Sequence, residues 1–405
     1  MNIIIQSILP WLQLILLIII GLSVAYLFIF AVAGLFYRQP KYSSGQPFRK
    51  IAVLIPGYKE DQVIIEVAQE ALKQDYPHFS YDVIVIADSF RSETLGRLKE
   101  MPLKLIEVSF DKSTKAKALN KAMSLIGDDY EIAVILDADN IMASDFLTRI
   151  NAAFEKNIIA VQGHRAAKNL DTSLAILDAI SEEINNHIFR KGHRALGLSS
   201  AIIGSGMAFR YDFFKNIMSS VTAIGGFDKE IELKMLKNGH KVEYLHDAVV
   251  LDEKVQQAEV FSNQRRRWLS AQYHYFLKDF FASIFELIRH GNIDYFDKSF
   301  QFLQLPRILL LGAVYVFSIL FVSLNIWLNL APWLNIAWIV ALVLCTLALL
   351  FAVPRSYYNR ETLKALITLP GGMFLMFRSL LRIKGANKQF IHTQHGAVKT
   401  VKNSR

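Results

Sequence analysis

The sequence predicts an α/β domain, with a mostly parallel sheet flanked by helices, joined to transmembrane helices at both ends. Between residues 51 and 137, short apolar runs alternate with segments of helical spacing, which is the pattern of a parallel sheet. Long apolar blocks lie near the two ends of the chain, and 53% of all residues are hydrophobic. Basic residues directly flank these blocks, as they do on the cytoplasmic side of membrane segments.

The first apolar block covers residues 8–36, where Gln13 and Ser23 are the polar exceptions. It is much longer than the roughly 7–15 residues of a signal-peptide core, and no basic region precedes it. Because its length suffices to cross a bilayer, we expect residues 1–40 to form a transmembrane anchor. Basic residues follow at 38–50, so the positive-inside rule places the next part of the chain in the cytoplasm.

A globular domain is expected between residues 48 and 290, built on buried strands that end at polar residues. Apolar runs predict the strands, and segments with apolar residues on one side predict the helices. Strands that alternate with helices favour right-handed crossovers, which bring the carboxyl ends of the strands to one edge. The expected strands cover residues 51–55, 81–87, 103–108 and 131–137, and the expected helices cover residues 62–74 and 115–126.

Two further apolar blocks, 301–330 and 332–353, predict two transmembrane helices within residues 301–353. Basic residues after the second block return the chain to the cytoplasm. The next segment, 361–384, is apolar but is interrupted by a Pro-Gly-Gly sequence and carries four basic residues. Crossing the membrane there would place the basic tail, 385–405, outside. We therefore expect an interfacial or re-entrant helix and a cytoplasmic tail.

The net charge of +9 indicates an acidic partner, and the distribution of the basic residues decides which one. No basic segment interleaved with aromatic residues resembles a nucleic-acid-binding motif, so no nucleic acid is expected. A lipid bilayer explains the charge better because the basic residues flank the apolar blocks. The single cysteine, Cys345, lies in such a block and leaves no disulfide or cysteine-based metal site.

Two carboxylates, Asp137 and Asp139, follow an apolar strand. Side chains at positions i and i+2 of an extended chain leave the same face, and open α/β sheets bind ligands beyond the carboxyl ends of their strands. A hard divalent cation, Mg²⁺ or Mn²⁺, suits two such carboxylates and would hold the diphosphate of a substrate. A plain polar turn is the alternative, since aspartate is common in turns.

Other polar residues end the first two expected strands at the same edge of the sheet. Pro56, Tyr58 and Glu60 follow the first strand, and Asp88 follows the second. A base and a ribose could lie against these residues, with a diphosphate and a metal at the two aspartates. Taken singly, the Pro-Gly sequence can be a simple turn and Asp88 a helix cap. The convergence on one edge is what predicts a binding site.

Lys115 and Lys117 open the expected helix at 115–126, and Asn120 follows one turn later. A cation in the first turn of a helix opposes the helix dipole. An anionic ligand near this turn would explain why two cations stand there. A solvated basic face is the alternative.

The sequence Gln264-Arg265-Arg266-Arg267-Trp268 brings positive charge and an aromatic ring together. Arginines stabilise the charge that grows on a leaving diphosphate, and an indole stacks on the face of a sugar ring. The alternative is a basic, Trp-anchored amphipathic helix at the membrane interface. Both can hold, with Arg265 and Arg266 at the membrane and the other three residues in the site.

In this order along the chain, the motifs resemble the membrane-integrated family 2 glycosyltransferases with a GT-A fold, the group of the cellulose, chitin and hyaluronan synthases. The resemblance covers about residues 48–290, and its strongest part is Gln-x-x-Arg-Trp at 264–268. It implies a catalytic domain that binds a nucleotide-diphosphate sugar donor, with Mg²⁺ or Mn²⁺ on the diphosphate. The implied donor-binding residues are Pro56, Tyr58, Glu60, Asp88, Lys117, Asn120 and Asp137, with Asp137 and Asp139 as metal ligands.

The resemblance also implies the acceptor side of the site. Arg267 would stabilise the departing diphosphate, as a catalytic residue. A glycine-rich segment at 204–210 resembles the strand on the acceptor side in this family. The implied acceptor-binding residues are Gly204, Ser205, Gly206, Gln264 and Trp268.

The general base is the point at which this sequence departs from the family. The family usually has a Glu-Asp pair before a helix, with the aspartate as the base, whereas Lys229-Glu230 stands at that position here. Glu230 is the expected base, since it can make the same proton transfer from one methylene further away. Asp228 is the other candidate, and acidic residues that only cap the helix are the alternative.

These observations predict an inverting glycosyltransferase on the cytoplasmic face of a bacterial-type inner membrane, using a UDP-sugar. The acceptor would be a growing polysaccharide or a lipid-linked carbohydrate, and the sequence identifies no polysaccharide-export partner. One rival is an enzyme that adds a single sugar to a membrane lipid, because three spans make a sparse channel for a polymer. The other rival is a non-catalytic family member that acts as a membrane scaffold or sensor. The departure at Lys229-Glu230 favours it, whereas the intact Asp88, Asp137, Asp139 and 264–268 motif argue against it.

Overall fold

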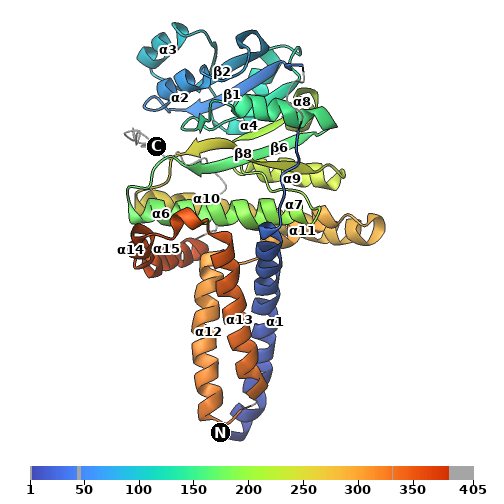
Figure 1. Ribbon diagram of the computed structural model, residues 1–405, viewed down its shortest axis with the longest axis vertical. Helices are drawn as coiled ribbons and strands as arrows, with labels where there is room; N and C mark the ends of the chain where they lie inside the picture. The colour runs from blue at the N-terminus through green and yellow to red at the C-terminus, as the bar shows by residue number, and fades with distance from the viewer. Residues whose placement is uncertain (1, 43–46, 331, 383–405) are drawn as a thin grey trace.

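In the computed structural model, which describes residues 2–42, 47–330 and 332–382, an α/β domain lies above three long helices (Figure 1). Strands and helices alternate through the domain, and apolar helices lie near the two ends of the described chain. The predicted fold class is therefore confirmed. The expected tail at 385–405 falls outside the described residues.

Among the described residues, eight strands form one sheet in the order β3-β2-β1-β4-β7-β6-β8-β5. All of them run in one direction except β7 and β5, which pair antiparallel with their neighbours. The four strands expected from the sequence are β1 to β4, and they form a parallel half-sheet. The strands are β1 (Ile51–Tyr58), β2 (Tyr81–Asp88), β3 (Lys104–Val108), β4 (Ile132–Ile135), β5 (Ile141–Met142), β6 (Ala160–Ala167), β7 (Met207–Arg210) and β8 (Val242–Asp252).

Helices cover both faces of the sheet because its central strands are apolar on both sides. Every residue of β1 except Tyr58 is buried. Ile64 and Leu147 pack on one face, and Leu119 and Phe214 pack on the other. The helices on the first face are α2 (Ile64–Ala71), α3 (Ser92–Lys99) and α5 (Phe146–Ala153), and those on the second are α4 (Lys115–Leu125), α8 (Tyr211–Ser219) and α9 (Phe227–Lys237).

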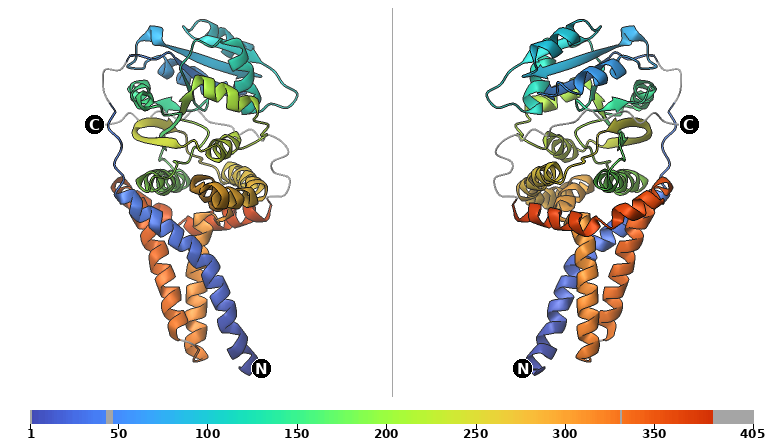
Figure 2. Two further views of the ribbon diagram at one scale, coloured as in Figure 1. Left: turned by 90° about the vertical axis from the view of Figure 1, so that its right-hand side faces the viewer. Right: turned by 90° about the vertical axis from the view of Figure 1, so that its left-hand side faces the viewer.

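A layer of helices separates the sheet from the three long helices (Figures 1 and 2). The second half of α10 exposes Leu277, Phe281, Phe285 and Ile288 at helical spacing, so this part of the helix has an exposed apolar face. Such a face is typical of a helix that lies on a membrane surface. The layer consists of α6 (Ser173–Asn185), the π-helical segment η3 (Asn186–Gly192), α7 (His193–Ala195), α10 (Ala258–His290) and α11 (Ile293–Leu303).

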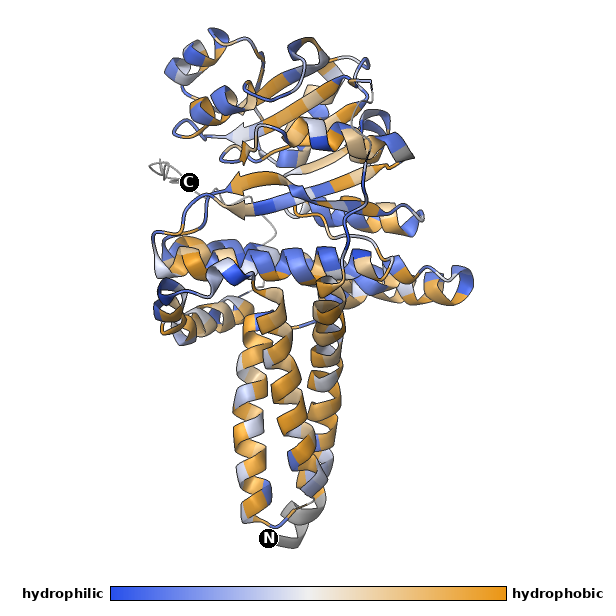
Figure 3. Ribbon diagram, viewed as in Figure 1, coloured by the Kyte–Doolittle hydropathy of each residue, from blue (hydrophilic) through white to orange (hydrophobic). Residues whose placement is uncertain are grey.

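In the described part of the chain, three helices are long and apolar enough to span a membrane. Hydrophobic residues cover most of their length in Figure 3. The single apolar block expected at 301–330 is divided, because α11 ends at Leu303 and the next helix begins at Arg307, after Pro306. Proline has no backbone N–H and restricts the residue before it, so it separates the two helices. The three helices are α1 (Asn2–Leu35), α12 (Arg307–Trp327) and α13 (Pro332–Ala352).

The segment expected to be interfacial or re-entrant forms two helices, α14 (Arg360–Leu366) and α15 (Leu369–Leu381), bent by 49° at their junction. They lie across the ends of α12 and α13 that face the domain (Figure 1). α14 packs on α6, and α15 packs on α10 and α12. Together they are also apolar enough to count as one broken span, so their relation to the membrane stays a prediction.

Helix α1 is fixed to the domain by a buried polar contact. The hydroxyl group of Tyr26 donates to Oδ1 of Asp297 at 2.7 Å and lies 2.9 Å from Nε2 of His193. The ring of Phe30 stacks on His193 with 3.8 Å between centroids. Gly192 lies so close to α1 that an added Cβ would be 2.2 Å from the carbonyl oxygen of Phe30. Only glycine permits this approach, so η3 and α1 are in direct backbone contact.

A polar cluster lies inside the apolar bundle. Asn325 of α12 exchanges two hydrogen bonds with Gln13 of α1, at 2.7 and 3.0 Å, and donates to Asn335 of α13 at 2.8 Å. Gln13 and Asn325 are buried. In lipid, such side chains need protein partners, so this cluster ties the three helices together.

We expect Asn325→Leu to lower the melting temperature of the detergent-solubilised protein, because Gln13 loses its partner. Each interhelical hydrogen bond in a membrane contributes about 0.6 kcal/mol, so a shift of a few degrees is expected. Ser323→Leu is the matched control, since Ser323 lies on the same helix and is exposed. Equal melting temperatures for the two variants would contradict a structural role for the cluster.

Candidate active site

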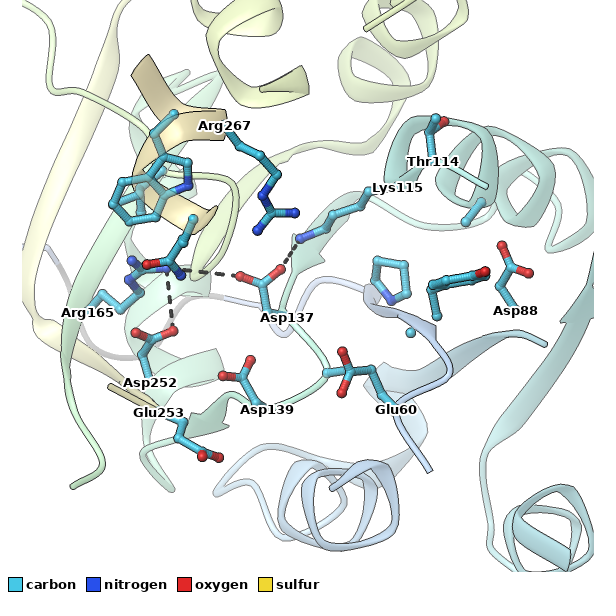
Figure 4. A pocket seen from close by; sticks show the side chains of 18 of the residues that line it. Glu60, Asp88, Thr114, Lys115, Asp137, Asp139, Arg165, Asp252, Glu253 and Arg267 are labelled. Atoms are coloured by element: carbon cyan, nitrogen blue, oxygen red, sulfur yellow. Dashed lines mark hydrogen bonds and ion pairs between the residues drawn. The ribbon is translucent and has the colours of Figure 1, made fainter. Parts of the chain in front are cut away.

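A cavity of about 260 Å³ lies beyond the carboxyl ends of β1, β2, β4 and β8, and α10 contributes Gln264, Arg267 and Trp268 to its lining. Figure 4 shows Arg267 beside Lys115 and Asp137 in this cavity. Parallel strands bring their carboxyl ends to one edge, which explains why residues from distant parts of the chain meet here. Lys117, Asn120 and Glu230 do not line this cavity. The residues predicted from the sequence that do line it are Pro56, Tyr58, Glu60, Asp88, Asp137, Asp139, Gln264, Arg267 and Trp268.

Three carboxylates meet at the centre of the edge. Asp137, Asp139 and Asp252 each offer an oxygen, and these oxygens all lie within 4.8 Å of one another. The amide of Asn140 donates to Asp139 and to Asp252, at 3.1 Å in each case, and so holds two of the carboxylates together. Oxygen ligands are what Mg²⁺ and Mn²⁺ prefer, so the arrangement fits the expected cation.

Asp252 was missed in the sequence although a signal was present. Val249, Val250 and Leu251 form an apolar run that ends in an aspartate, as the run before Asp137 does. Both aspartates lie at the ends of strands that point to the same edge, β8 and β4. β8 lies outside the strands expected from the sequence, which end at residue 137.

Arg165 of β6 lies among these carboxylates. Its guanidinium is 3.5 Å from Asp252, 4.0 Å from Asp137 and 3.2 Å from Glu182 of α6. Burial opposes the charge on Arg165, but the carboxylates, Asp252 first, outweigh burial and raise its pKa. Burial likewise acts against ionised Asp252, but Arg165 and Lys254 outweigh it and lower the pKa of that carboxyl. Arg165 and Asp252 are therefore held in their charged forms.

Lys115, rather than Lys117, reaches the cavity. Nζ of Lys115 lies 2.5 Å from Asp137 and donates to the carbonyl of Gly204 at 2.7 Å. Thr114 caps α4 and accepts from the backbone N–H of Lys117, while Nζ of Lys117 donates to the carbonyl of Lys112. Asn120 is turned inward and donates to the carbonyl of Met218 at 3.0 Å.

The glycine-rich segment before β7 runs beside the carboxylates. Gly204 and Gly206 have φ angles of 83° and 60°, which a residue with a side chain rarely adopts. The hydroxyl of Ser205 accepts from the backbone N–H of Asp137 at 2.9 Å and contacts Asn140. A Cβ on Gly204 would lie 3.6 Å from Asp228, so this segment connects the carboxylates to the start of α9.

A second cavity, of about 370 Å³, adjoins the first and shares Lys115, Asp137 and Arg267 with it. Asp228 lines the second cavity, and its side chain is 3.7 Å from that of Lys229. Glu230 does not line it. Instead, Glu230 is buried, 2.8 Å from Lys234 one turn further along α9. Of the two candidate bases, Asp228 is the one that lines the second cavity.

Helix α10 presents different residues to different surroundings. Gln264, Arg267 and Trp268 line the first cavity, and burial lowers the pKa of Arg267 while Asp137 acts to raise it. Arg265 is turned away, between the rings of Trp268 and Phe261, at 4.3 and 4.7 Å from their centroids. It also forms an ion pair with Asp178 of α6. One side of α10 therefore lines the first cavity, while Arg265 on another side of the helix binds α6.

A family model described as glycosyltransferase like family 2 matches residues 47–271, which is more than half of the chain. The chain belongs to the family 2 glycosyltransferases. The family resemblance drawn from the motifs is thus confirmed, and the protein is a transferase. The matched residues include every residue that lines the first cavity.

Two relatives illustrate the range of this family. The beta-monoglucosyldiacylglycerol synthase of Trichormus variabilis is 25% identical over 255 residues, covering 60% of this chain and 52% of that protein. The chain spans about half the length of that relative. A probable glycosyltransferase of Bacillus subtilis, YdaM, is 24% identical over 289 residues, which is 67% of each chain.

A solved structure supports the GT-A fold. The mannosyltransferase PcManGT from Pyrobaculum calidifontis, in complex with GDP-Man and Mn²⁺, superposes with a TM-score of 0.53 at 16% identity. The match covers 91% of this glycosyltransferase and 98% of the other chain. At this identity the similarity establishes the fold alone.

Mn²⁺ should raise the melting temperature of this glycosyltransferase, because a ligand that binds only the folded state stabilises it by mass action. At 100 times the dissociation constant the gain is about 2.7 kcal/mol. Asp139→Asn should lose most of the gain, whereas Asp111→Asn, at an exposed aspartate outside the cavity, should keep it. An undiminished shift in Asp139→Asn would show that the ion binds elsewhere. Melting curves with Mn²⁺ and with EDTA provide the measurement.

Proposed function

We propose that this glycosyltransferase moves a sugar from a UDP-sugar to an acceptor hydroxyl, with inversion at the anomeric carbon. The observation that carries the proposal is the junction of two cavities. Asp137 and Arg267 line both of them, the other carboxylates lie on one side, and Asp228 lies on the other. A donor in the first cavity and an acceptor in the second would meet at this junction.

The first cavity offers the groups that a nucleotide-diphosphate sugar needs. Pro56, Tyr58 and Asp88 line its outer part, where a base and ribose would bind. Asp137, Asp139 and Asp252 would hold Mg²⁺ or Mn²⁺, which supplies positive charge to the diphosphate when it is bound. The structural neighbour was solved with GDP-Man and Mn²⁺, so GDP-mannose belongs in the panel of donors to be tested.

Bond making and breaking can be assigned to residues of the chain. The carboxylate of Asp228 accepts the proton of the acceptor hydroxyl, whose oxygen attacks the anomeric carbon from the side opposite the diphosphate. The bond from that carbon to the diphosphate oxygen breaks, and the leaving group keeps the electron pair. Arg267 and Lys115 stabilise the negative charge on it. An α-linked donor thereby gives a β-linked product.

The choice of Asp228 over Glu230 rests on where their carboxylates lie. Asp228 borders the second cavity, beside Gly204. Glu230 is 2.8 Å from Lys234 and accepts from the backbone N–H of Thr222, so its oxygens stabilise the first turns of α9. A base must lie within hydrogen-bond reach of the proton that it removes, and Asp228 is the candidate that lines the cavity where the acceptor would bind.

Asp228→Asn should slow transfer by roughly 10²–10⁴-fold, the usual contribution of a general base. Glu230→Gln is the matched control and should keep transfer within a few-fold of the wild type, with a lower melting temperature because the ion pair with Lys234 is lost. Donor binding should be unchanged in both variants. If Glu230→Gln is the severe variant and Asp228→Asn the mild one, the assignment of the base is reversed.

The products of the reaction distinguish a polysaccharide synthase, a lipid glycosyltransferase and a non-catalytic scaffold. A growing polysaccharide would give a ladder of products, whereas transfer to a membrane lipid gives one. The relative from Trichormus is named for a glucosylated diacylglycerol, which favours the lipid. A non-catalytic scaffold would release no nucleotide from any donor. Incubation of solubilised protein with Mn²⁺ and a panel of UDP-sugars and GDP-mannose, reading released UDP or GDP, tests for catalysis directly.

We also propose that the domain faces the cytoplasm of the inner membrane, as the basic flanks of the apolar segments favour. Cys345 is the chain's only cysteine and is buried, so single cysteines can report the topology in a Cys345→Ser background. An impermeant maleimide added to intact cells should label Asn329→Cys, in the loop between α12 and α13. It should label Ser219→Cys only in inverted vesicles, and the opposite pattern would reverse the orientation.

A further inference from the structure

A third and larger cavity, of about 780 Å³, lies where the domain meets the long helices. Its walls come from α6 above, from the domain-side ends of α12 and α13, and from α14 and α15 at the side. The lining is mainly apolar, with Ile180, Leu311, Leu349, Val353 and Met376 among its residues. Its volume is within the range of about 300–1,000 Å³ that is typical of ligand sites.

One end of this cavity carries charge. Arg307, the first residue of α12, lines it and donates through Nη2 to the carbonyl and the hydroxyl of Ser181, at 3.1 and 3.4 Å. Nη1 of Arg307 is buried and has no hydrogen-bond partner among the described residues. A buried guanidinium N–H without a partner is costly, so an oxygen-bearing ligand at this end would relieve a real deficit.

The charged end adjoins both catalytic cavities. Asp178, paired with Arg265, lines the third cavity and also the first. Arg307 lies over the ring of Phe189, 5.5 Å from its centroid, and Phe189 lines the second cavity. A single layer of side chains therefore separates the apolar cavity from the place where transfer is proposed.

We propose that the third cavity binds an acyl chain of the acceptor, a membrane lipid that carries a hydroxyl group. A headgroup oxygen accepts from Nη1 of Arg307, and the hydroxyl points toward the junction of the two catalytic cavities. This inference rests on the proposed function and names its acceptor class. An acyl chain is the fitting occupant because the cavity opens between helices that span the membrane, where acyl chains are the surrounding solvent. A sugar polymer offers no apolar chain for such a lining.

Two adjacent glycines allow the cavity to be filled with a matched control. Gly372 lines the cavity and is buried, and a Cβ there meets only Ile308, at 3.8 Å. Gly371 is exposed, does not line the cavity, and has nothing within 4 Å of an added Cβ. Gly372→Phe therefore places a ring where the acyl chain would lie, while Gly371→Phe places the same ring outside.

The experiment uses the full chain in nanodiscs that contain dioleoylglycerol or dioleoylphosphatidylglycerol, in separate arms. Nucleotide release and glycolipid formation are measured together, and a diazirine-bearing acyl chain maps the contact. Gly372→Phe should reduce glycolipid formation roughly tenfold, the loss expected from about two displaced methylenes, and should abolish crosslinking to α12, α13 and α15. Gly371→Phe should retain both. The two arms show whether an ester or a phosphate oxygen serves Arg307.

Arg307→Gln should likewise reduce glycolipid formation, with Arg378→Gln on the exposed face of α15 as its control. Nucleotide release without lipid should be the same in all variants, which separates a binding defect from misfolding. If Gly372→Phe forms glycolipid at the wild-type rate, or is crosslinked as before, the cavity does not hold the acceptor. If no donor is turned over even by the wild type, the proposed function itself is wrong, and the acceptor assignment falls with it.

Discussion

The ion pairs of Arg165 are the constraint on which the site depends. One guanidinium joins β6 to Asp252 at the end of β8, to Asp137 after β4 and to Glu182 on α6. Carboxylates this close together in a poorly hydrated site repel one another, and each uncompensated charge would cost several kcal/mol. The cation therefore holds both halves of the sheet and the helix layer beneath it in one arrangement. Arg165 lines the first cavity, whereas the basic residues Lys115 and Arg267 line both cavities.

Most of the parallel half of the sheet could be predicted because β1, β2 and β4 are short apolar runs that are buried on both faces. The other half could not. β6 carries Gln162 and Arg165 inside a strand, and β8 is interrupted by His246 and Asp247. These polar residues are tolerated because partners from distant segments satisfy them, and a local pattern contains no trace of those partners. Pro306 did signal the break between α11 and α12, but the apolar residues on both sides concealed it.

The site residues at strand ends could be predicted because the apolar runs before them mark where each strand ends. For residues on helices, the rotation of the helix about its axis decides which side chain faces the cavity, and the sequence does not give that rotation. Lys115 and Lys117 are two positions apart, and so are Asp228 and Glu230. Residues at that spacing lie on nearly opposite sides of a helix, so one faces the cavity and the other does not. The capping hydroxyl of Thr114 fixes the start of α4, and the left-handed Gly226 fixes the start of α9. Neither rotation follows from composition or from the order of motifs.

The close packing of α1 on η3 has a consequence for how far the domain can move. Gly192 brings the two backbones into contact, and Tyr26, His193 and Asp297 bond across the same joint. A pivot of the domain on the long helices would break these buried contacts together. These buried contacts thus set the distance between the carboxylates of the first cavity and the three long helices. The reach of an incoming substrate, rather than a hinge in the enzyme, must bridge that distance.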